Sequence, residues 1–241
     1  MAKTILSDAL IVFDGYAIRE SANAVSIDYG AEELDGTTLA DNTRIMVGGL
    51  LTAAMGAEGF FDAPNPDSAF FDQMGLSEKV ITIAPKTVEG GIGYSLNALL
   101  GSYNPGAPVG ELLKYSISAG AQDRLVRGTL LANKTGIITS GSGTAFQVGA
   151  ATATQTIFAA LHVVGATGTT PTLDLIVESD DAVGMTTPTT RITFAQATGV
   201  GSQFKKLAGP VTDSWWRVKY TLGGATPNFG FVVLVGILEN R

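Results

Sequence analysis

The sequence predicts an all-β protein with one short helix. Apolar and polar residues alternate with a period of two along most of the chain, which is typical of strands that bury one face. Of the 241 residues, 45% are hydrophobic and 15% are charged, and 30 are glycine. That composition favours a globular, β-rich protein over a disordered one. A chain of this length can bury roughly 70% of its unfolded surface, so a stable core is expected.

The first group of expected strands lies before residue 135, and each is an alternating run. These strands are expected at Ala9–Ile18, Ala24–Tyr29, Leu51–Phe61, Lys79–Ala84, Gly91–Ser102, Gly110–Ser118 and Leu125–Leu131. Between the second and third of them, the segment from Glu32 to Gly49 is acidic and Thr-rich and has few aliphatic residues. We expect a long polar loop there. A loop of this length in a compact domain normally has a function.

One segment, APNPDSAFFDQMGLSEK, is predicted to be helical. Asn65 can cap it, Pro66 suits the first helical position, and Asp67 complements the helix dipole. Gly75 can end the helix in the left-handed conformation. Its expected apolar side, which would pack the helix on a sheet, is formed by Phe70, Phe71 and Met74.

A second group of strands follows a segment rich in Gly, Ser and Thr. They are expected at Thr156–Gly165, Thr172–Glu178, Arg191–Ala195, Ser202–Ala208, Ser214–Leu222 and Phe229–Leu238. The composition change predicts a first β domain over residues 1–134, a linker over 135–155, and a second half over 156–241. The fold class is therefore all-β with two β-sandwich halves.

Charge is distributed unevenly along the chain. The formal net charge is −7, but residues 1–72 hold twelve acidic and three basic residues, a net −9, and the remainder carries about +2. No basic stripe with interleaved aromatic residues is present, so specific nucleic-acid binding is not expected. The acidic third is either a solvated face that aids solubility or a surface with an electrostatic role.

Candidate catalytic or metal-binding chemistry is scarce. The chain has one histidine, His162, and no cysteine, and His162 lies in an apolar alternating run. A structural histidine with satisfied hydrogen bonds is expected. Glu178, Asp180 and Asp181 occur together in VESDDA, which turn chemistry explains and which lacks the pattern of a calcium loop. No nucleophile, base and orienting residue can be assembled, so an enzyme is not expected, nor a cofactor or a bound metal.

Two adjacent tryptophans, Trp215 and Trp216, lie on an expected strand and therefore point to opposite faces. One is expected in the core and the other at a surface or interface.

The order of segments in the first half resembles that of a known family. The motifs are AEELDGTT…R…GL, then GAEGFFDA, then the short helix PDSAFFDQMG, then SYNPGAPVGELLKYSISAG…RGTLL. Over roughly residues 10–131 they are similar to the major tail tube protein of long-tailed, siphovirus-type bacteriophages. After residue 135 the strands are similar to several phage structural modules.

The resemblance implies a virion structural protein that self-assembles into stacked rings around a β-barrel lumen. Viral DNA would pass through this tube during ejection without specific binding. The rings of this family stack through a long hairpin loop, so the loop here would contact the next ring through Glu32, Glu33, Asp35, Thr37, Asp41 and Arg44. The partners would be further copies of the chain and other tail proteins. Several first-third carboxylates would line the lumen, because alternate residues of barrel strands point inward.

Three copies per ring, with both halves lining the lumen, are favoured over six copies with the second half outside. The chain has two strand groups of domain size, and each contains a pair of long alternating runs that could join a barrel. The N-terminus lacks the apolar run of a signal peptide, and the longest apolar run is about half a membrane span. We therefore expect synthesis in the host cytoplasm, no membrane partner, and a final place in the virion tail.

Two alternatives remain open at this point. The Thr- and Gly-rich second half and the tryptophan pair also fit a β-sandwich that binds a surface or a carbohydrate, as a virion decoration. The segment from Glu32 to Gly49 could also be a flexible surface hairpin without a partner.

Overall fold

The structure is a computed structural model that describes residues 6, 8–61 and 65–240. It confirms the all-β fold with one short helix. The elements, in chain order, are β1 (Leu10–Phe13), β2 (Tyr16–Ala17), β3 (Ala22–Asp35), β4 (Met46–Phe60), α1 (Asn65–Phe71), β5 (Lys79–Ala84), β6 (Ile92–Gly106), β7 (Lys114–Ala121), β8 (Val126–Ile137), β9 (Gly141–Ser142), β10 (Phe146–Gln147), β11 (Gln155–Asp180), β12 (Thr189–Thr193), β13 (Gly201–Ala208) and β14 (Trp215–Glu239). All pairings between these strands are antiparallel.

The first half is built on a core between two layers of strands. One layer has the strand order β3-β4-β7-β6. From β6 the sheet continues into the other layer, in which β5 pairs with β6 and β1 pairs with β5. Because side chains alternate along a strand, one face of each strand enters this core. Its members include Phe13, Met55, Leu100 and Tyr115, all at most 2% exposed.

Helix α1 covers one side of this core through a single large side chain. Phe70 is fully buried, with its ring centroid 5.5 Å from that of Phe13 and 5.6 Å from that of Tyr115. Phe71 is 72% exposed and Met74 is 39% exposed. The prediction of a three-residue apolar side was therefore wrong for these two residues within the subunit. Phe71 is next to Phe70 in sequence and therefore lies about 100° around the helix axis from it. Met74 lies beyond the end of the helix at Phe71, so no helical turn brings it under Phe70.

The ends of the helix are only partly described. The side chains of Asn65 and Pro66, expected to cap and start it, lie outside the described residues. Gly75 has the expected left-handed φ of +73°, but it does not end the helix, which stops at Phe71; Gly75 lies in the turn that follows, and its N–H donates to the Leu100 carbonyl oxygen. Tyr103 Oη donates a hydrogen bond of 2.8 Å to Asp67 Oδ1, which ties the helix to β6.

The second half is a sandwich made by one folded ribbon. Strands β11 and β14 pair with each other along almost their whole length, with register shifts around Thr167–Thr172. There the ribbon turns over, and Gly168 and Gly224 have φ of +127° and +92°. A Cβ on Gly224 would lie 2.3 Å from the carbonyl oxygen of Thr170, so the fold requires glycine at this position.

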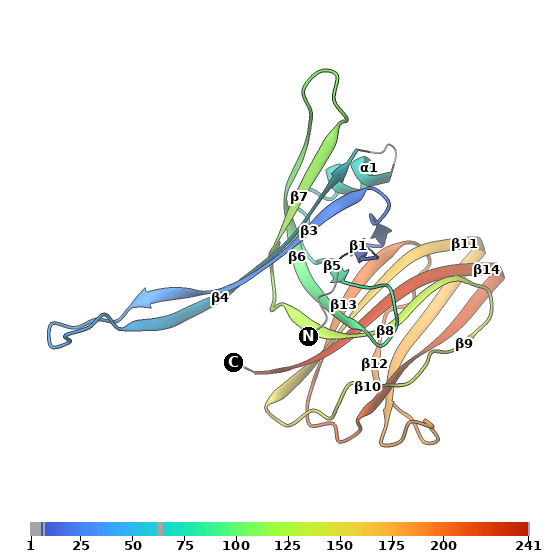
Figure 1. Cartoon of the computed structure of the whole chain (residues 1–241). Helices are drawn as coiled ribbons and strands as arrows, with labels where there is room; N and C mark the ends of the chain where they lie inside the picture. Colours follow the sequence, from blue (N-terminus) through green and yellow to red (C-terminus); the bar gives the residue numbers. More distant parts are fainter. Residues whose placement is uncertain (1–5, 7, 62–64, 241) are drawn as a thin grey trace.

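The two layers of the ribbon enclose a second core, which includes Leu161, Leu175, Trp216 and Phe231. The sequence predicted four separate strands in the segments that form only two long strands, β11 and β14. The bend of the ribbon interrupts the apolar alternation there, but the two strands remain paired on both sides of it. Figure 1 shows the long β11 and β14 curving through this half of the molecule.

The two halves are joined by contacts between β1, β5 and the outer face of the ribbon. Leu10, Val12 and Ala84 pack against Leu130 and Val232 in a small buried cluster. Strand β8, from the first half, pairs with β14 from the second. Within residues 135–155, the short strands β9 and β10 also pair with β14. The division into domains at 134 and 156 remains a prediction.

No helix among the described residues is long and apolar enough to cross a membrane.

Candidate assembly surface

The most exposed part of the chain is the hairpin formed by β3 and β4, which we call the arm (residues 29–51). Its strands pair from Ala22↔Gly59 near the body to Asp35↔Met46 near the tip. From the pair Ala31↔Leu51 outward, the arm has about ten residues per side, or roughly 30 Å at the rise of a strand. Figure 1 shows it extending well clear of the rest of the molecule.

The predicted loop from Glu32 to Gly49 is therefore mostly strand. Strand β3 continues to Asp35 and β4 begins at Met46, so the loop proper is residues 36–45. Sequence patterns missed this extension because the arm is exposed on both faces. Without an inner face there is no apolar alternation to recognise.

The arm carries an unusual number of exposed apolar side chains. Large apolar residues exposed by more than a third are Tyr29, Leu34, Leu39, Ile45, Met46, Val47, Leu50 and Leu51. Leu39, at the tip, is fully exposed. Soluble monomers rarely expose contiguous apolar patches of more than a few hundred Å², and larger ones mark interaction sites.

Hydrogen bonds within the tip hold the loop in shape. Asp35 Oδ1 accepts from the Thr37 backbone N–H at 3.0 Å, and Asp35 Oδ2 accepts from Arg44 Nε at 3.1 Å. Asp41 Oδ2 accepts from the backbone N–H and the hydroxyl of Thr38, at 2.7 and 2.8 Å. Hydrogen bonds from Thr37 lower the pKa of Asp35, and those from Thr38 lower the pKa of Asp41.

The predicted inter-ring residues thus fall into two groups. One group forms hydrogen bonds inside the tip, and it consists of Asp35, Thr37, Asp41 and Arg44. The polar side chains of these four residues therefore already have partners within their own subunit. Glu32 and Glu33 lie on the exposed outer part of β3. Contact of these six residues with a second ring remains a prediction.

The outer face of the four-stranded layer β3-β4-β7-β6 carries mostly small and polar residues, and its outermost row, Phe60–Lys114–Gly106, adds one partly exposed phenylalanine and one lysine. Cross-strand registers place three rows on it, namely Ala24–Glu58–Ser116–Asn104, Ser26–Gly56–Ser118–Ser102 and Asp28–Ala54–Gly120–Leu99. The neighbouring rows point into the first core, as Met55 and Ile117 show. In these three rows Leu99 is the one large apolar side chain, and the two charged residues, Asp28 and Glu58, are both acidic.

This layer has two open edges within the described chain. Strand β3 pairs with β4 alone, and Ser102–Gly106 of β6 pairs with β7 alone. Unpaired strand edges present free backbone N–H and C=O groups to any other strand.

His162 lies fully buried between the two halves. The polar atoms form a chain in which His162 Nε2 and Thr82 Oγ1 are 2.7 Å apart and Thr82 Oγ1 donates to Ser95 Oγ at 3.0 Å. His162 Nδ1 has no hydrogen-bond partner among the described residues, so the expectation of full satisfaction holds for one ring nitrogen only. Burial lowers the pKa of His162 to about 3, so the ring is neutral at physiological pH.

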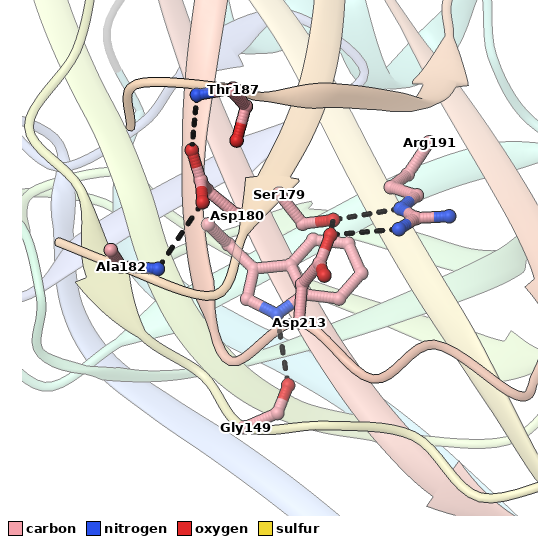
Figure 2. Close-up of polar contacts among 8 residues, drawn as sticks. Gly149, Ser179, Asp180, Ala182, Thr187, Arg191 and Asp213 are labelled. Carbon is pink, nitrogen blue, oxygen red and sulfur yellow. Dashed lines mark hydrogen bonds and ion pairs between the residues drawn. The ribbon is translucent and has the colours of Figure 1, made fainter. Parts of the chain in front are cut away.

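Turn chemistry accounts for Asp180 of the VESDDA segment (Figure 2), whereas Glu178 is buried in β11 and forms an ion pair with Arg217. Asp180 accepts hydrogen bonds from the backbone N–H groups of Ala182 and Thr187, at 3.2 and 2.8 Å. Beside it, Arg191 donates to Ser179 Oγ and Asp213 Oδ2, both at 2.7 Å. Within the described part of the chain, no group of three or more His, Asp or Glu residues is arranged to hold a metal ion.

The tryptophan pair divides as predicted. Trp216 is fully buried, and its Nε1–H donates to the Gly149 carbonyl oxygen at 2.9 Å, whereas Trp215 is only partly buried. Trp216 therefore anchors the second core, and it leaves no exposed aromatic pair for a ligand.

Comparison with known proteins returned matches among solved structures. A chain from "Virion of native gene transfer agent (GTA) particle" is 20% identical, with a TM-score of 0.39, over 49% of this chain and 93% of that one. The SPP1 tail tube is 14% identical, with a TM-score of 0.41, over 50% and 76%. The SPP1 Dit protein, described as a hub adsorption apparatus, is 10% identical, with a TM-score of 0.40, over 96% and 100%.

No family model and no curated protein matches the chain.

Proposed function

We propose that the chain is the structural subunit of a siphovirus-type tail tube, built from stacked rings of identical copies around a lumen for DNA. The observation that carries this proposal is the four-stranded layer with two open edges. An even number of antiparallel strands means that β3 of one copy can pair with β6 of the next and keep the sheet antiparallel throughout. A closed ring removes both edges from every copy.

The outer face of this layer suits the wall of the lumen. Small residues and serines leave few side chains to obstruct a passing duplex. Asp28 and Glu58 repel phosphates, whereas basic side chains would release counterions and hold DNA with a steep dependence on salt. The DNA would therefore slide through without being bound.

Strand pairing in the second half removes the reason for expecting three copies. That expectation required two long strands free to join a barrel. Strand β11 is paired by β14 on one side and by β12 and β13 on the other, and β14 is likewise flanked by β11 and β8. The second half would then lie outside the lumen as decoration.

The diameter of the barrel also favours six copies. At a strand spacing of about 4.8 Å and a tilt of about 40°, twelve strands from three copies close at a diameter of about 24 Å, and twenty-four strands from six close at about 48 Å. Side chains take roughly 5 Å from each wall. The smaller barrel would therefore keep a free width of about 14 Å and the larger one about 38 Å. A DNA duplex is roughly 20 Å wide, since its two grooves are about 8.5 and 7.5 Å deep. It fits the larger barrel and not the smaller one.

The arm would join successive rings. It extends beyond the layer that would form the wall, and its apolar side chains are exposed within their own subunit. Hydrogen bonds within the tip fix the conformation of the loop before any contact with another ring. Preformed loops lose less conformational entropy when they bind. Other tail proteins would contact the terminal rings through the same surfaces.

Electron microscopy of the purified protein tests the proposal. The parent should form hollow stacked rings with sixfold symmetry and six outer knobs. Replacing residues 32–50 by Asn-Gly, which suits a two-residue hairpin, should leave the free energy of unfolding within about 1–2 kcal/mol and abolish long tubes.

A matched control is Val183→Ser, which changes an exposed apolar residue of the second half and should leave tubes intact. Dispersed monomers of the parent would refute the proposed function. Full-length tubes from the arm deletion would refute the role of the arm, and threefold symmetry would restore the three-copy ring.

A further inference from the structure

A second apolar tip projects from the chain, between β6 and β7. It spans residues 107–113, and Val109 is fully exposed, Leu112 71% exposed and Leu113 41% exposed. Turns between strands are normally polar, so three exposed large apolar residues in one turn are unusual. Figure 1 shows this hairpin projecting away from the body in a different direction from the arm.

The two tips lie at opposite ends of the four-stranded layer. Strand β4 pairs with β7 from Ala54↔Gly120 to Phe60↔Lys114. The arm continues from the Ala54 end, because β4 runs back from there toward Met46. The turn between β6 and β7 continues from the Lys114 end. One apolar tip therefore points out of each end of the layer.

A groove lies at the root of the arm, on its inner face. It is lined by Tyr29 and Leu51 of the arm, by Thr52 and Ala53 beside them, and by residues 121–125 at and after the end of β7, which include one acidic and one basic residue; its volume is about 240 Å³. Tyr29 and Leu51 are 52% and 37% exposed. The groove is smaller than pockets for small molecules, which begin at about 300 Å³, so it fits side chains better than a free ligand.

Charge disfavours contact between two arms. Residues 29–51 carry four acidic residues and one basic residue, a net charge of −3, whereas residues 107–114 carry Glu111 and Lys114 and are neutral. Like charges brought together at an interface are destabilising. A neutral apolar tip meets no such repulsion at the root of the arm.

We propose that the β6–β7 tip of one copy packs into the groove beneath the arm of a copy in the adjacent ring. This inference rests on the proposed tube, in which every ring points the same way. In such a stack the arm end of one ring faces the tip end of the next, so the contact joins two different surfaces. The contact covers the apolar side chains of the tip together with Tyr29 and Leu51 at the root of the arm, all of which are exposed within their own subunit.

Disulfide trapping tests this contact directly, because the chain contains no cysteine. Tyr29→Cys and Leu112→Cys are made as separate proteins, mixed, assembled and oxidised, with Leu51→Cys as a second arm position. A disulfide requires Cα atoms within about 7 Å, so a cross-linked dimer is expected from the mixtures and not from either protein alone. Val183→Cys mixed with Leu112→Cys is the control and should give none.

A second variant measures the strength of the contact. Val109→Asp with Leu112→Asp should form rings and raise the critical concentration for tube elongation about a hundredfold, because burial of each large apolar side chain is worth about tenfold or more. Ile138→Asp with Val183→Asp, at two exposed apolar positions outside the arm and the tip, should elongate like the parent.

Each outcome separates the two proposals. Tubes that form without cross-linked dimers, and that elongate normally in the tip variant, overturn this contact and leave the tube standing. A parent protein that forms neither rings nor tubes overturns both.

Discussion

Phe70 and Phe71 make a matched pair for testing how α1 is held. They are adjacent and identical in chemistry, yet Phe70 is fully buried and Phe71 is 72% exposed. Phe70 also has its ring centroid within 5.5–5.6 Å of three other rings, those of Phe13, Tyr103 and Tyr115. Truncating each to alanine therefore compares one buried phenylalanine with one exposed phenylalanine on the same helix.

The expected costs differ several-fold. Phe→Ala in a core costs about 3–5 kcal/mol, and lost aromatic contacts add about 0.5–1.5 kcal/mol per pair to area burial alone, so we expect Phe70→Ala near the top of the range, about 4–5 kcal/mol. Phe71→Ala should stay within about 0.5 kcal/mol. At about 2–4 °C per kcal/mol for a chain of this size, the melting temperatures should differ by about 8–20 °C.

Urea and thermal unfolding of the unassembled protein, followed by near-ultraviolet circular dichroism, measure this difference. A low protein concentration keeps any role of Phe71 in assembly out of the result. If Phe71→Ala destabilised the subunit as much as Phe70→Ala, the helix would be packed through another face. A loss below 1 kcal/mol for Phe70→Ala would show that α1 does not depend on this side chain.

Two further predictions concern the wall and the arm. Reversing Asp28 and Glu58 to Lys should make assembled tubes retain DNA, and the logarithm of the binding constant should fall linearly with the logarithm of the salt concentration. The control variant, Asp174→Lys with Asp181→Lys, should not retain DNA. Tubes that do not bind DNA after the first reversal would show that Asp28 and Glu58 do not face the lumen. The pKa values of Asp35 and Asp41 are lowered in the folded tip because their ionised carboxylates accept hydrogen bonds. These hydrogen bonds therefore stabilise the tip fully at pH values above the ordinary pKa of 3.8, and this stabilisation is lost as pH falls through the lowered pKa of the folded state. Titration of both carboxyl groups by nuclear magnetic resonance should therefore give midpoints below 3.8, and a midpoint at or above it would contradict the tip geometry.

The sequence predicted best those elements that contact a core. Strand β5 has the bounds that alternation predicts, Lys79–Ala84. One tryptophan of the adjacent pair and one phenylalanine of the helix are core residues, as predicted, but the pattern did not say that they would be Trp216 and Phe70. Apolar residues record these contacts, along both faces of β5 and on one side of α1.

Three features could not be read from local pattern. The arm has no buried face beyond its root, so its strands look like loop. The doubling back of β11 and β14 depends on pairing between residues far apart in sequence. Burial of Phe70 rather than Phe71 depends on where the helix axis lies relative to β6. Val109, Leu112 and Leu113 did carry a signal, since apolar residues stood in a turn rich in Gly and Pro.

In the proposed tube, charge on the open edge of β3 bears on how rings would close. Asp28, Glu32, Glu33 and Asp35 lie along this strand, and charged residues on an edge strand oppose pairing with a like edge. Two β3 edges would bring these carboxylates together, whereas the open part of β6, Ser102–Gly106, carries no charge. Repulsion therefore leaves β3 with β6 as the favoured pairing, which is the one that continues around a ring. This selection acts through exposed charges and weakens as salt shortens the screening length from about 10 Å at 0.1 M to about 3 Å at 1 M. Ring closure would thus be most accurate at moderate ionic strength, where the edges still distinguish a like partner from an unlike one.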